Sequence, residues 1–333
     1  MMKRPGLAEI ESVPEPAACE NSLLLKVRRV GFCGSDLNSF RGKNPLVSYP
    51  RIPGHEVSAT IVEGSRTDPN LAAGMNVTLS PCTNCGACAA CRRGRPNACK
   101  FNETLGVQRD GALAEYIRVP AEKIHAAKLS LTELCLVEPL TVGFHAVARG
   151  RVTADDTVAI FGCGGVGLGA IAASSFRGAK TIAVDVADEK LETARAAGAA
   201  HTINTVRDDL HKGLAELTDG HGPDVVIEAI GLPQTFRAAV EEVAFTGRVV
   251  YIGYAKEQVS YETRFFVQKE LDILGSRNAL PEDFRAVIRM LEGGRFPVNE
   301  AISSVVTMDD APGALRAWSD DPSRIKKIMV SLD

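Results

Sequence analysis

The stretch TVAIFGCGGVG at residues 157–167 decides the fold, because it joins a buried-type strand to a glycine-rich turn and then to a helix. Its glycines stand in the spacing GxGxxG. Such glycines permit a tight turn, let the backbone approach a pyrophosphate and allow the helix to pack closely on the strand. The helix N-terminus adds unpaired N–H groups and a partial positive charge, so this turn predicts a dinucleotide-binding site.

Asp185 strengthens this prediction, since it ends a second expected strand 23 residues after Gly162. A carboxylate at that position accepts hydrogen bonds from a ribose diol and repels a 2′-phosphate, which favours NAD over NADP. A purely structural glycine turn is the alternative, and the combination of strand, turn, helix and acid argues against it. The residues expected to bind the cofactor are Gly162, Gly164, Gly165, Val166, Gly167 and Asp185.

Around this motif, strands and helices alternate, as in a parallel sheet with right-handed crossovers. Strands are expected at 157–161, 181–185, 225–230 and 248–252, and helices at 166–176, 189–197 and 234–243. An amphipathic helix is expected at 281–292, in the tail that does not extend the alternation. Residues 23–119 instead contain short apolar runs separated by Gly, Pro, Asn and Asp, which is typical of a β-rich domain. We therefore expect an α/β protein with a parallel-sheet NAD-binding domain at 149–279 and a β-rich domain at 1–148, which residues 280–333 rejoin.

The composition excludes several classes of protein. The 333 residues include 38 Lys and Arg against 41 Asp and Glu, a formal net charge of −3, so no global positive field would hold nucleic acid or anionic lipid. The longest stretch without charged or strongly polar residues, 158–173, is too short and too rich in glycine for a membrane span. Residues 1–7 show no secretory signal, so we expect a cytoplasmic protein without nucleic-acid or membrane partners.

Five of the nine cysteines fall within residues 82–99, and four of them have the spacing C-x2-C-x2-C-x7-C. In a chain without a secretory signal, this crowding indicates metal rather than disulfides. Four thiolates fill a tetrahedral zinc ion completely, so the ion would be structural, and Arg92, Arg93 and Arg95 would offset the negative charge. A nucleic-acid-binding finger is the rival interpretation, and Cys82 could replace the first ligand. The expected zinc ligands are Cys85, Cys88, Cys91 and Cys99.

A second group of residues indicates an open metal site. Cys33 lies in the motif GFCGSD, and His55 and Glu56 lie in PGHE. A thiolate, a neutral imidazole and a carboxylate would leave the fourth position of a zinc ion open for water or an alcohol. The third ligand is either Glu56 or Glu138, an acid within an apolar run that needs a metal or another cation if it is buried. Each residue alone has an ordinary structural interpretation, and the combination favours a metal.

The chain resembles the zinc-dependent medium-chain alcohol dehydrogenases, and within them the sorbitol dehydrogenase branch. The resemblance covers nearly the whole chain and rests on GFCGSD at 31–36, GHE at 54–56, the four-cysteine lobe, GVQRDGALAEY at 106–116, EPL at 138–140 and GCGGVG at 162–167. It implies a GroES-like catalytic domain, a Rossmann domain and a cleft between them, with one catalytic zinc, one structural zinc and NAD. It also implies a homodimer or homotetramer and the oxidation of a secondary alcohol to a ketone.

The resemblance assigns the catalytic zinc and its chemistry to Cys33, Ser35, His55, Glu138 and, as the alternative third ligand, Glu56. Ser35 corresponds to the hydroxyl that takes the substrate proton, and Val142 to the residue behind the nicotinamide. Relatives commonly have a histidine three residues after that serine, whereas this chain has Asn38, which cannot titrate. The proton relay would therefore run through water, the cofactor ribose or another base.

The segments GSRNALPEDF and SYPR resemble those of bacterial L-galactonate or L-gulonate 5-dehydrogenases. This resemblance implies a sugar acid or a polyol as the substrate, with Asn38 and Arg277 as candidate contacts. The planar guanidinium of Arg277 would grip a carboxylate at two points, or else pair with Glu282 or Asp283. The alternatives are a polyol, polyol-phosphate or threonine dehydrogenase of the same branch and, in another class, a noncatalytic protein that binds NAD and zinc.

Overall fold

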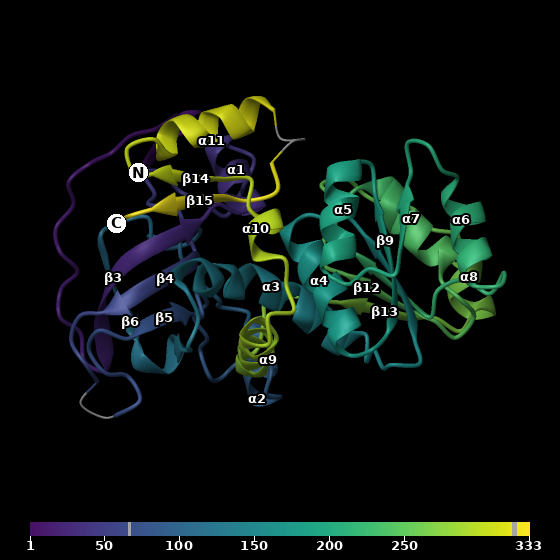
Figure 1. The fold of residues 1–333 in the computed structure, drawn as a ribbon, viewed down its shortest axis with the longest axis horizontal. Coiled ribbons are helices and arrows are strands. Elements are labelled where there is room, and N and C mark those ends of the chain that lie inside the picture. Colours follow the sequence, from purple (N-terminus) through teal and green to yellow (C-terminus); the bar gives the residue numbers. More distant parts are fainter. Residues whose placement is uncertain (66–67, 322–324) are drawn as a thin grey trace. The chain divides into compact units, whose positions relative to one another are not determined.

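The computed structural model describes residues 1–65, 68–321 and 325–333 and divides into two compact units. Unit 1 comprises Met1–Glu138 with Val298–Asp333, and unit 2 comprises Pro139–Pro297. Unit 2 is built on a parallel sheet and unit 1 on a mostly antiparallel one (Figure 1). The expected α/β class is therefore confirmed.

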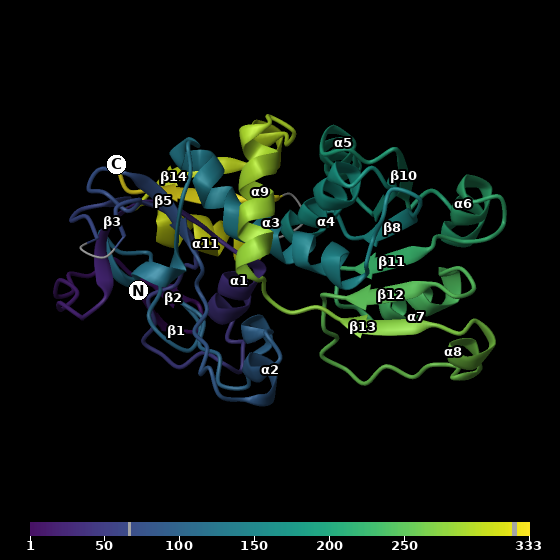
Figure 2. The ribbon, with the colours of Figure 1, turned by 90° about the horizontal axis from the view of Figure 1, so that it is seen from below.

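Unit 2 contains a six-stranded parallel sheet in the order β10-β9-β8-β11-β12-β13, of which β8, β11, β12 and β13 lie side by side in Figure 2. The order corresponds to 3-2-1-4-5-6, the doubly wound arrangement in which dinucleotides bind at the carboxyl ends of the strands. The strands are β8 (Thr157–Phe161), β9 (Lys180–Asp185), β10 (His201–Asn204), β11 (Val225–Glu228), β12 (Arg248–Tyr251) and β13 (Asp272–Gly275). The helices are α4 (Gly165–Phe176), α5 (Asp188–Ala196), α6 (Leu210–Leu217), α7 (Pro233–Glu242), α8 (Arg264–Gln268) and α9 (Pro281–Glu292).

The strands of unit 2 are short apolar runs because helices cover both faces of a parallel sheet. Ile160, Ile182, Val226 and Val249 are fully buried. The glycine-rich turn leads from β8, a central strand, directly into α4. This arrangement puts the turn at the carboxyl edge of the sheet.

Helix α3 (Leu131–Arg149) begins in unit 1 and continues into unit 2, where it packs tightly on α4. A Cβ at Gly143 would lie 2.1 Å from Ala170 N, and one at Gly169 would lie 2.7 Å from Leu140 O. Glycine at these positions lets the two helix backbones come closer than side chains would allow. The units divide at residues 139 and 298, whereas the sequence analysis places the boundaries at 149 and 280.

Unit 1 contains a seven-stranded sheet in which β14, β15, β3, β4, β5 and β7 follow one another and β6 pairs with β3. The C-terminal strand β15 lies antiparallel to β3, so the end of the chain adjoins the strand that leads to Cys33. The strands are β1 (Met2–Arg4), β2 (Leu7–Ala8), β3 (Ser22–Gly31), β4 (Glu56–Ile61), β5 (Asn76–Leu79), β6 (Tyr116–Pro120), β7 (Ile124–Ala126), β14 (Ser304–Thr307) and β15 (Ile328–Ser331). The helices are α1 (Gly34–Phe40), α2 (Ala89–Arg92), α10 (Val298–Ala301) and α11 (Ala311–Asp320), with single 3-10 turns at Pro96–Ala98 and Ala121–Lys123.

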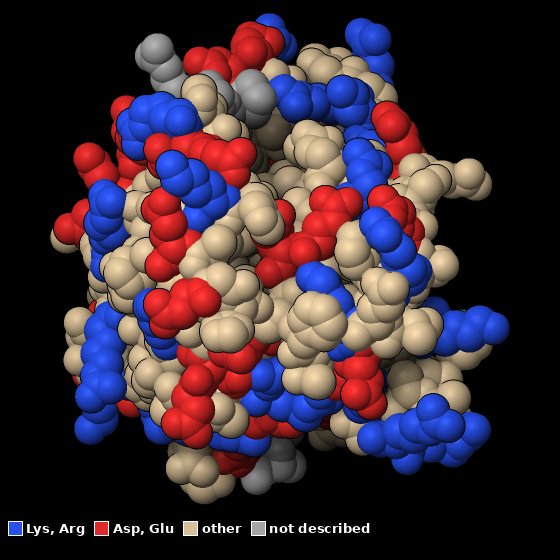
Figure 3. Space-filling model, turned by 90° about the vertical axis from the view of Figure 1, so that its right-hand side faces the viewer, with Lys and Arg blue, Asp and Glu red and all other residues tan. Residues whose placement is uncertain are grey.

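The length of the apolar helices and the distribution of surface charge both bear on possible partners. Among the described residues, α3 is the one helix that is long and apolar enough to cross a membrane, and 67% of its apolar window is buried inside the protein, as in a core helix. On the face of the molecule that Figure 3 presents, acidic and basic side chains are interspersed. That face therefore shows no continuous field of one sign, in keeping with the net charge of −3.

Gly143→Ala should destabilise unit 2, because the added methyl group would meet the backbone of Ala170. Overpacking costs roughly 1–3 kcal/mol, and a backbone obstacle puts this variant at the upper end. Gly313→Ala is the matched control, since Gly313 lies in α11 with no atom within 4 Å of an added Cβ. It should stabilise the chain by up to about 1 kcal/mol. Denaturant unfolding followed by circular dichroism measures both, and equal stability of the two variants would contradict the close contact of α3 with α4.

Candidate active site

Cys33, His55 and Glu56 come together at the ends of two neighbouring strands of unit 1. Strand β3 ends at Gly31, β4 begins at Glu56, and these two residues pair across the antiparallel strands. The ligand atoms of Cys33, His55 and Glu56 all lie within 4.8 Å of one another. A Cβ at residue 31 would lie 2.2 Å from Glu56 Oε2, so glycine at this position leaves room for the Glu56 side chain. Strand pairing thus gathers sulfur, nitrogen and oxygen donors from two distant motifs.

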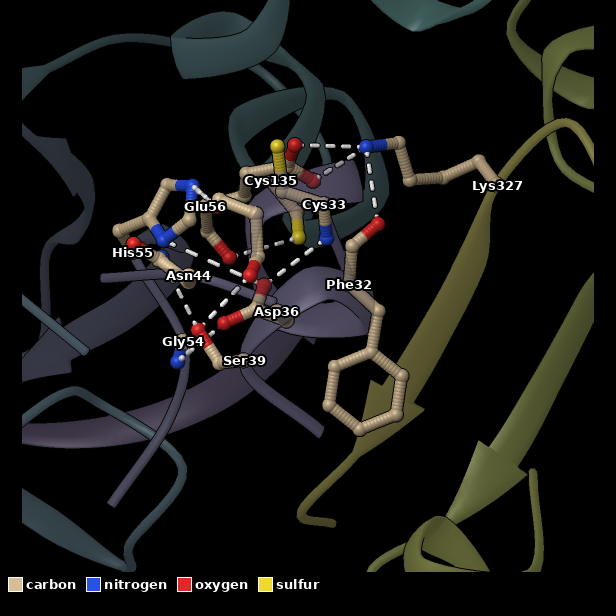
Figure 4. A network of polar contacts seen from close by, with 11 residues as sticks. Phe32, Cys33, Asp36, Ser39, Asn44, Gly54, His55, Glu56, Cys135 and Lys327 are labelled. Carbon is tan, nitrogen blue, oxygen red and sulfur yellow. Dashed lines mark hydrogen bonds and ion pairs between the residues drawn. The ribbon is translucent and has the colours of Figure 1, made fainter. Parts of the chain in front are cut away.

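Asp36 lies behind this group, and the sequence analysis missed it. Its Oδ2 accepts a hydrogen bond from Cys33 N at 2.9 Å, and its Oδ1 accepts one from Gly54 N at 3.3 Å (Figure 4). The same Oδ2 lies 4.0 Å from His55 Nδ1. The side chain is buried, and burial raises the pKa of Asp36. An acid three residues after the N-cap position of α1 is the sequence signal that could have found it.

The charges around His55 favour a bound cation. Burial lowers the pKa of His55, but the negative charges of Asp36, Cys33 and Glu138 outweigh burial and raise this pKa well above its usual value. Burial also raises the pKa of Glu138, to about 7, against the opposing effect of His55. His55 Nδ1 is buried without a hydrogen-bond partner among the residues that the structure describes. A divalent ion with affinity for sulfur, nitrogen and oxygen fits this donor set, and zinc is such an ion.

Lys327 is the second residue that the sequence analysis missed. Its Nζ donates to both oxygens of Glu56, at 2.6 and 2.5 Å, and to Phe32 O at 3.2 Å (Figure 4). Lys327 is 5% exposed and Glu56 is 1% exposed, so this is a buried ion pair. Burial lowers the pKa of Lys327, yet the charges of Glu56 and Cys33 outweigh burial and raise it. Of the two acids proposed as the third ligand, Glu56 therefore already has a cation.

Ser35 and Asn38 both lie on α1, immediately after Cys33. Ser35 Oγ lies 3.5 Å from His55 Nε2, so the hydroxyl adjoins the donor group. Asn38 is half-buried, and its carbonyl oxygen accepts a hydrogen bond from Lys43 N at 2.8 Å. Residues three apart share one face of a helix, so Asn38 follows Ser35 along the same side of α1.

Cys85, Cys88, Cys91 and Cys99 form a second donor group in the lobe around α2. Their sulfur atoms lie within 4.8 Å of one another, and Cys88 Sγ is 3.6 Å from Cys91 Sγ. Backbone N–H groups point at the sulfurs, for example from Cys88 to Cys85 at 3.3 Å. The N–H groups of Cys91 and Lys100 lower the pKa of Cys88 to about 6. Burial and the neighbouring sulfurs raise the pKa of Cys91 to about 11, so the N–H groups favour a thiolate at Cys88 but not at every position. Four converging cysteine sulfurs are the ligand set of a closed zinc site.

Cys82, the alternative ligand considered for this lobe, stands apart from the group. Its Sγ lies 3.5 Å from Thr104 Oγ1, and Cys82 and Thr104 form an isolated β-bridge. None of the nine cysteines takes part in a disulfide. The arrangement fits four-thiolate binding of one ion without Cys82.

The glycine-rich turn and Asp185 lie together at the carboxyl ends of β8 and β9 in unit 2. Asp185 Oδ2 accepts a hydrogen bond from Cys163 N, and its Oδ1 accepts one from Val186 N, both at 2.7 Å. Gly167 must be glycine, because a Cβ there would lie 1.7 Å from Gly162 O. The carboxylate thus fixes the shape of the turn as well as facing the site.

A cavity of about 720 Å³ opens beside this turn, within the size range of ligand pockets. Of the residues predicted to bind the cofactor, it is lined by Gly162, Gly164 and Asp185. Gly165 and Val166 begin α4, where backbone N–H groups lack partners within the helix. Val142 is half-buried on α3, also in unit 2, and is not part of the lining.

Arg277 lies exposed in the loop between β13 and α9 of unit 2. Asp283, one of its two predicted alternative partners, makes other contacts. Asp283 Oδ2 is 2.9 Å from His145 Nδ1 and accepts a hydrogen bond from Leu280 N at 2.8 Å. Asp283 is therefore a buried cap of α9.

Two family models match the chain: the alcohol dehydrogenase GroES-like domain at residues 20–129 and the zinc-binding dehydrogenase domain at residues 165–293. L-galactonate-5-dehydrogenase of Escherichia coli K12 is 32% identical to this chain over 282 residues, which cover 84% of this chain and 83% of the relative. Sorbitol dehydrogenase of Bacillus subtilis is 31% identical over 333 residues, which cover 97% and 93%.

Solved structures share the fold over nearly the whole chain. A short chain alcohol dehydrogenase of E. coli CFT073, complexed with NADH, has a TM-score of 0.91 and 28% identity, covering 99% of this chain and 98% of its own. A putative zinc-binding dehydrogenase of Sinorhizobium meliloti, bound to NADP, has the same TM-score and identity and covers 99% and 97%. Similar folds therefore occur with either dinucleotide.

Lys327→Met should destabilise the metal-free protein, because it leaves the Glu56 carboxylate buried without its cation. Removing one partner of a buried ion pair costs about 3–5 kcal/mol. The double variant Glu56→Gln/Lys327→Met should recover most of this loss, since neither charge remains. Denaturant unfolding of the single and double variants, analysed as a double-mutant cycle, measures the coupling. An unchanged free energy of unfolding for Lys327→Met would contradict the ion pair.

Proposed function

The chain belongs to the zinc-type alcohol dehydrogenases, and we propose that it transfers a hydride from a secondary alcohol of a sugar acid or polyol to NAD+, giving a ketone. The observation that carries the proposal is the donor group of Cys33, His55 and Glu56, with the Ser35 hydroxyl beside it and the charge of Glu138 acting on His55. The dinucleotide turn of unit 2 supports it, because the reaction needs a hydride acceptor.

Cys33 and His55 would hold the catalytic zinc. When bound, zinc supplies a Lewis acid that makes the hydroxyl group of a substrate easier to deprotonate. We propose Glu138 as the third ligand, because Lys327 already occupies both oxygens of Glu56. Asp36 Oδ2 lies 4.0 Å from His55 Nδ1, too far for a hydrogen bond, so its charge rather than a direct bond would favour this orientation of the imidazole. The four-cysteine lobe would hold a second, structural zinc.

Ser35 would accept the proton of the substrate hydroxyl. Its Oγ lies next to His55 Nε2, and the residue is half-buried. The hydroxyl can therefore hold a proton at the donor group while it remains in contact with water. Asn38, on the same side of α1, can donate and accept hydrogen bonds but cannot titrate. The proton would therefore leave Ser35 through water or the cofactor ribose.

Asp185 supports the preference for NAD over NADP. Backbone N–H groups of Cys163 and Val186 hold its carboxylate at the end of β9, and a carboxylate there repels a 2′-phosphate. The E. coli CFT073 structure contains NADH and the S. meliloti structure contains NADP, so the preference is a property to be tested for each chain.

The substrate class rests on two observations. The relatives include an L-galactonate-5-dehydrogenase and a sorbitol dehydrogenase, whose named substrates are a sugar acid and a polyol. Arg277, exposed in unit 2, has the bidentate geometry that suits a carboxylate. Relatives named D-arabitol-phosphate dehydrogenase and L-threonine 3-dehydrogenase support the phosphate and amino-acid alternatives. The oligomer, the cytoplasmic location and the lack of nucleic-acid partners stay predictions.

Cys33→Ser, His55→Ala and Glu138→Gln should each abolish turnover and reduce zinc from two ions to one per chain, because each removes a proposed ligand of the open site. NADH binding should stay nearly unchanged, since the dinucleotide cavity lies within unit 2. Zinc content is measured by elemental analysis, turnover by absorbance at 340 nm with sugar acids and polyols, and NADH binding by fluorescence titration.

Cys82→Ser is the matched control and should keep both zinc ions and full turnover. Activity retained by Cys33→Ser would refute the open site, and a noncatalytic relative would show no turnover with any substrate. If Glu56→Gln/Lys327→Met loses the second zinc while Glu138→Gln keeps it, the third ligand is Glu56.

Arg277→Ala should raise the KM for an aldonate about tenfold or more and leave that for the matched alditol nearly unchanged. The reason is the loss of two charge-assisted hydrogen bonds to a carboxylate, which the alditol lacks. Steady-state kinetics of the wild type and the variant on both substrates measure the effect. If the wild type does not prefer the aldonate to the alditol, or if Arg277→Ala keeps that preference, Arg277 does not recognise a carboxylate.

A further inference from the structure

Glu228 is a fully buried acid in unit 2 to which the proposed reaction gives no role. It is the last residue of β11, which pairs with β8, and its exposed fraction is 0%. Glutamate is almost never fully buried unless it is paired. The groups that contact its carboxylate therefore indicate its role.

One oxygen of Glu228 collects three hydrogen-bond donors. Oε1 accepts from Ile230 N at 2.9 Å, from Gly231 N at 2.8 Å and from Thr235 Oγ1 at 2.7 Å. Thr235 lies in the first turn of α7, where its Oγ1 also accepts a hydrogen bond from Leu232 N at 3.3 Å. Leu232 O, at 2.9 Å, competes with Glu228 for the one proton of this hydroxyl. A single oxygen thus ties together the end of β11, the turn that follows it and the start of α7.

The other oxygen, Oε2, is buried and has no hydrogen-bond partner within residues 1–65, 68–321 and 325–333. A Cβ at Gly253, just after β12, would lie 2.6 Å from this oxygen and 2.5 Å from Gly231 N. Gly231 itself has φ +86°. An unsatisfied buried oxygen is unfavourable, so the three donors on Oε1 have to offset the burial of Oε2.

The turn that this carboxylate holds forms one wall of the dinucleotide cavity. Ala229, Ile230, Leu232 and Thr235 all line the cavity. Ile230 also packs against the glycine-rich turn, since a Cβ at Gly162 would lie 2.6 Å from Ile230 Cγ1. A shift of this wall would therefore reach the glycine-rich turn, which also lines the cavity.

We propose that Glu228 is a positioning residue for the cofactor. Its buried Oε1 binds the 229–232 turn and the start of α7, and in this way Glu228 sets the shape of the cavity wall. Glu228 would thus determine the affinity for the dinucleotide without touching it. This inference rests on the proposed function, because it assumes that the cavity takes NAD. The three donors converge from backbone and side chain, so an uncharged acceptor would hold the turn less firmly.

Glu228→Gln keeps the size of the side chain and an acceptor oxygen but removes the charge. We expect the dissociation constant for NADH, measured by fluorescence titration, to rise about tenfold, the effect of losing one charge-assisted hydrogen bond. The KM for NAD+ should rise in parallel, while kcat at saturating NAD+ changes by less than about twofold, because the lost interaction affects binding uniformly.

Asp224→Asn is the matched control. Asp224 precedes the opposite end of β11, outside the cavity lining, and its Oδ2 accepts a hydrogen bond from Thr157 N at 2.7 Å. This variant should lower the midpoint of unfolding and leave the dissociation constant for NADH unchanged. Thr235→Val and Thr235→Ser form a second pair: the valine removes one of the three donors and should weaken NADH binding, and the serine restores the hydroxyl and the affinity.

If Glu228→Gln binds NADH with wild-type affinity and only its midpoint of unfolding falls, as in Asp224→Asn, the role of Glu228 is merely structural. That result would overturn the proposal. If Glu228→Gln does not fold, equal affinities of Thr235→Val and Thr235→Ser would overturn it. A wild-type protein that binds neither NADH nor NADPH would instead refute the proposed function.

Discussion

The crowding of buried ionisable groups at the ends of β3 and β4 is the constraint on which unit 1 depends. Asp36 and Glu56 are almost completely buried, and Cys33 and Glu138 add to the negative charge around His55. Lys327 offsets one of these charges from the neighbouring end of β15. The remaining sulfur, nitrogen and carboxylate groups are the ligands that zinc prefers. The fold therefore gathers groups whose burial a cation would make favourable.

In unit 2, backbone N–H groups rather than cations stabilise the buried acids. Asp185 ends β9 and accepts from the N–H groups of Cys163, Val186 and Ala187. Glu228 ends β11 and accepts from the N–H groups of Ile230 and Gly231. In both cases the chain leaving the strand bends back onto the acid. Because the carboxyl ends of parallel strands share one edge, Asp185 and the turn that Glu228 holds line one cavity.

Local patterns predict most of unit 2, and one deviation is informative. The glycine spacing predicts the turn between β8 and α4, and the helix expected at 281–292 coincides with α9. The strand expected at 225–230 instead ends at residue 228. The apolar run continues past that point, but the Glu228 side chain takes the N–H groups of Ile230 and Gly231 out of the sheet. Hydrophobic periodicity does not report such a hydrogen bond.

Contacts between residues far apart in the sequence cannot be predicted from local patterns. One such contact, an ion pair, changes the interpretation of the metal site. Lys327 and Glu56 are 271 residues apart, and no periodic pattern links them. From the sequence, Glu56 and Glu138 are equal candidates for the third ligand. In the fold they differ, because an ion on Glu56 would compete with an ammonium group for the same oxygens, whereas an ion on Glu138 would offset a charge that burial makes unfavourable. The proposal of Glu138 as the third ligand thus depends on Lys327, which belongs to no motif.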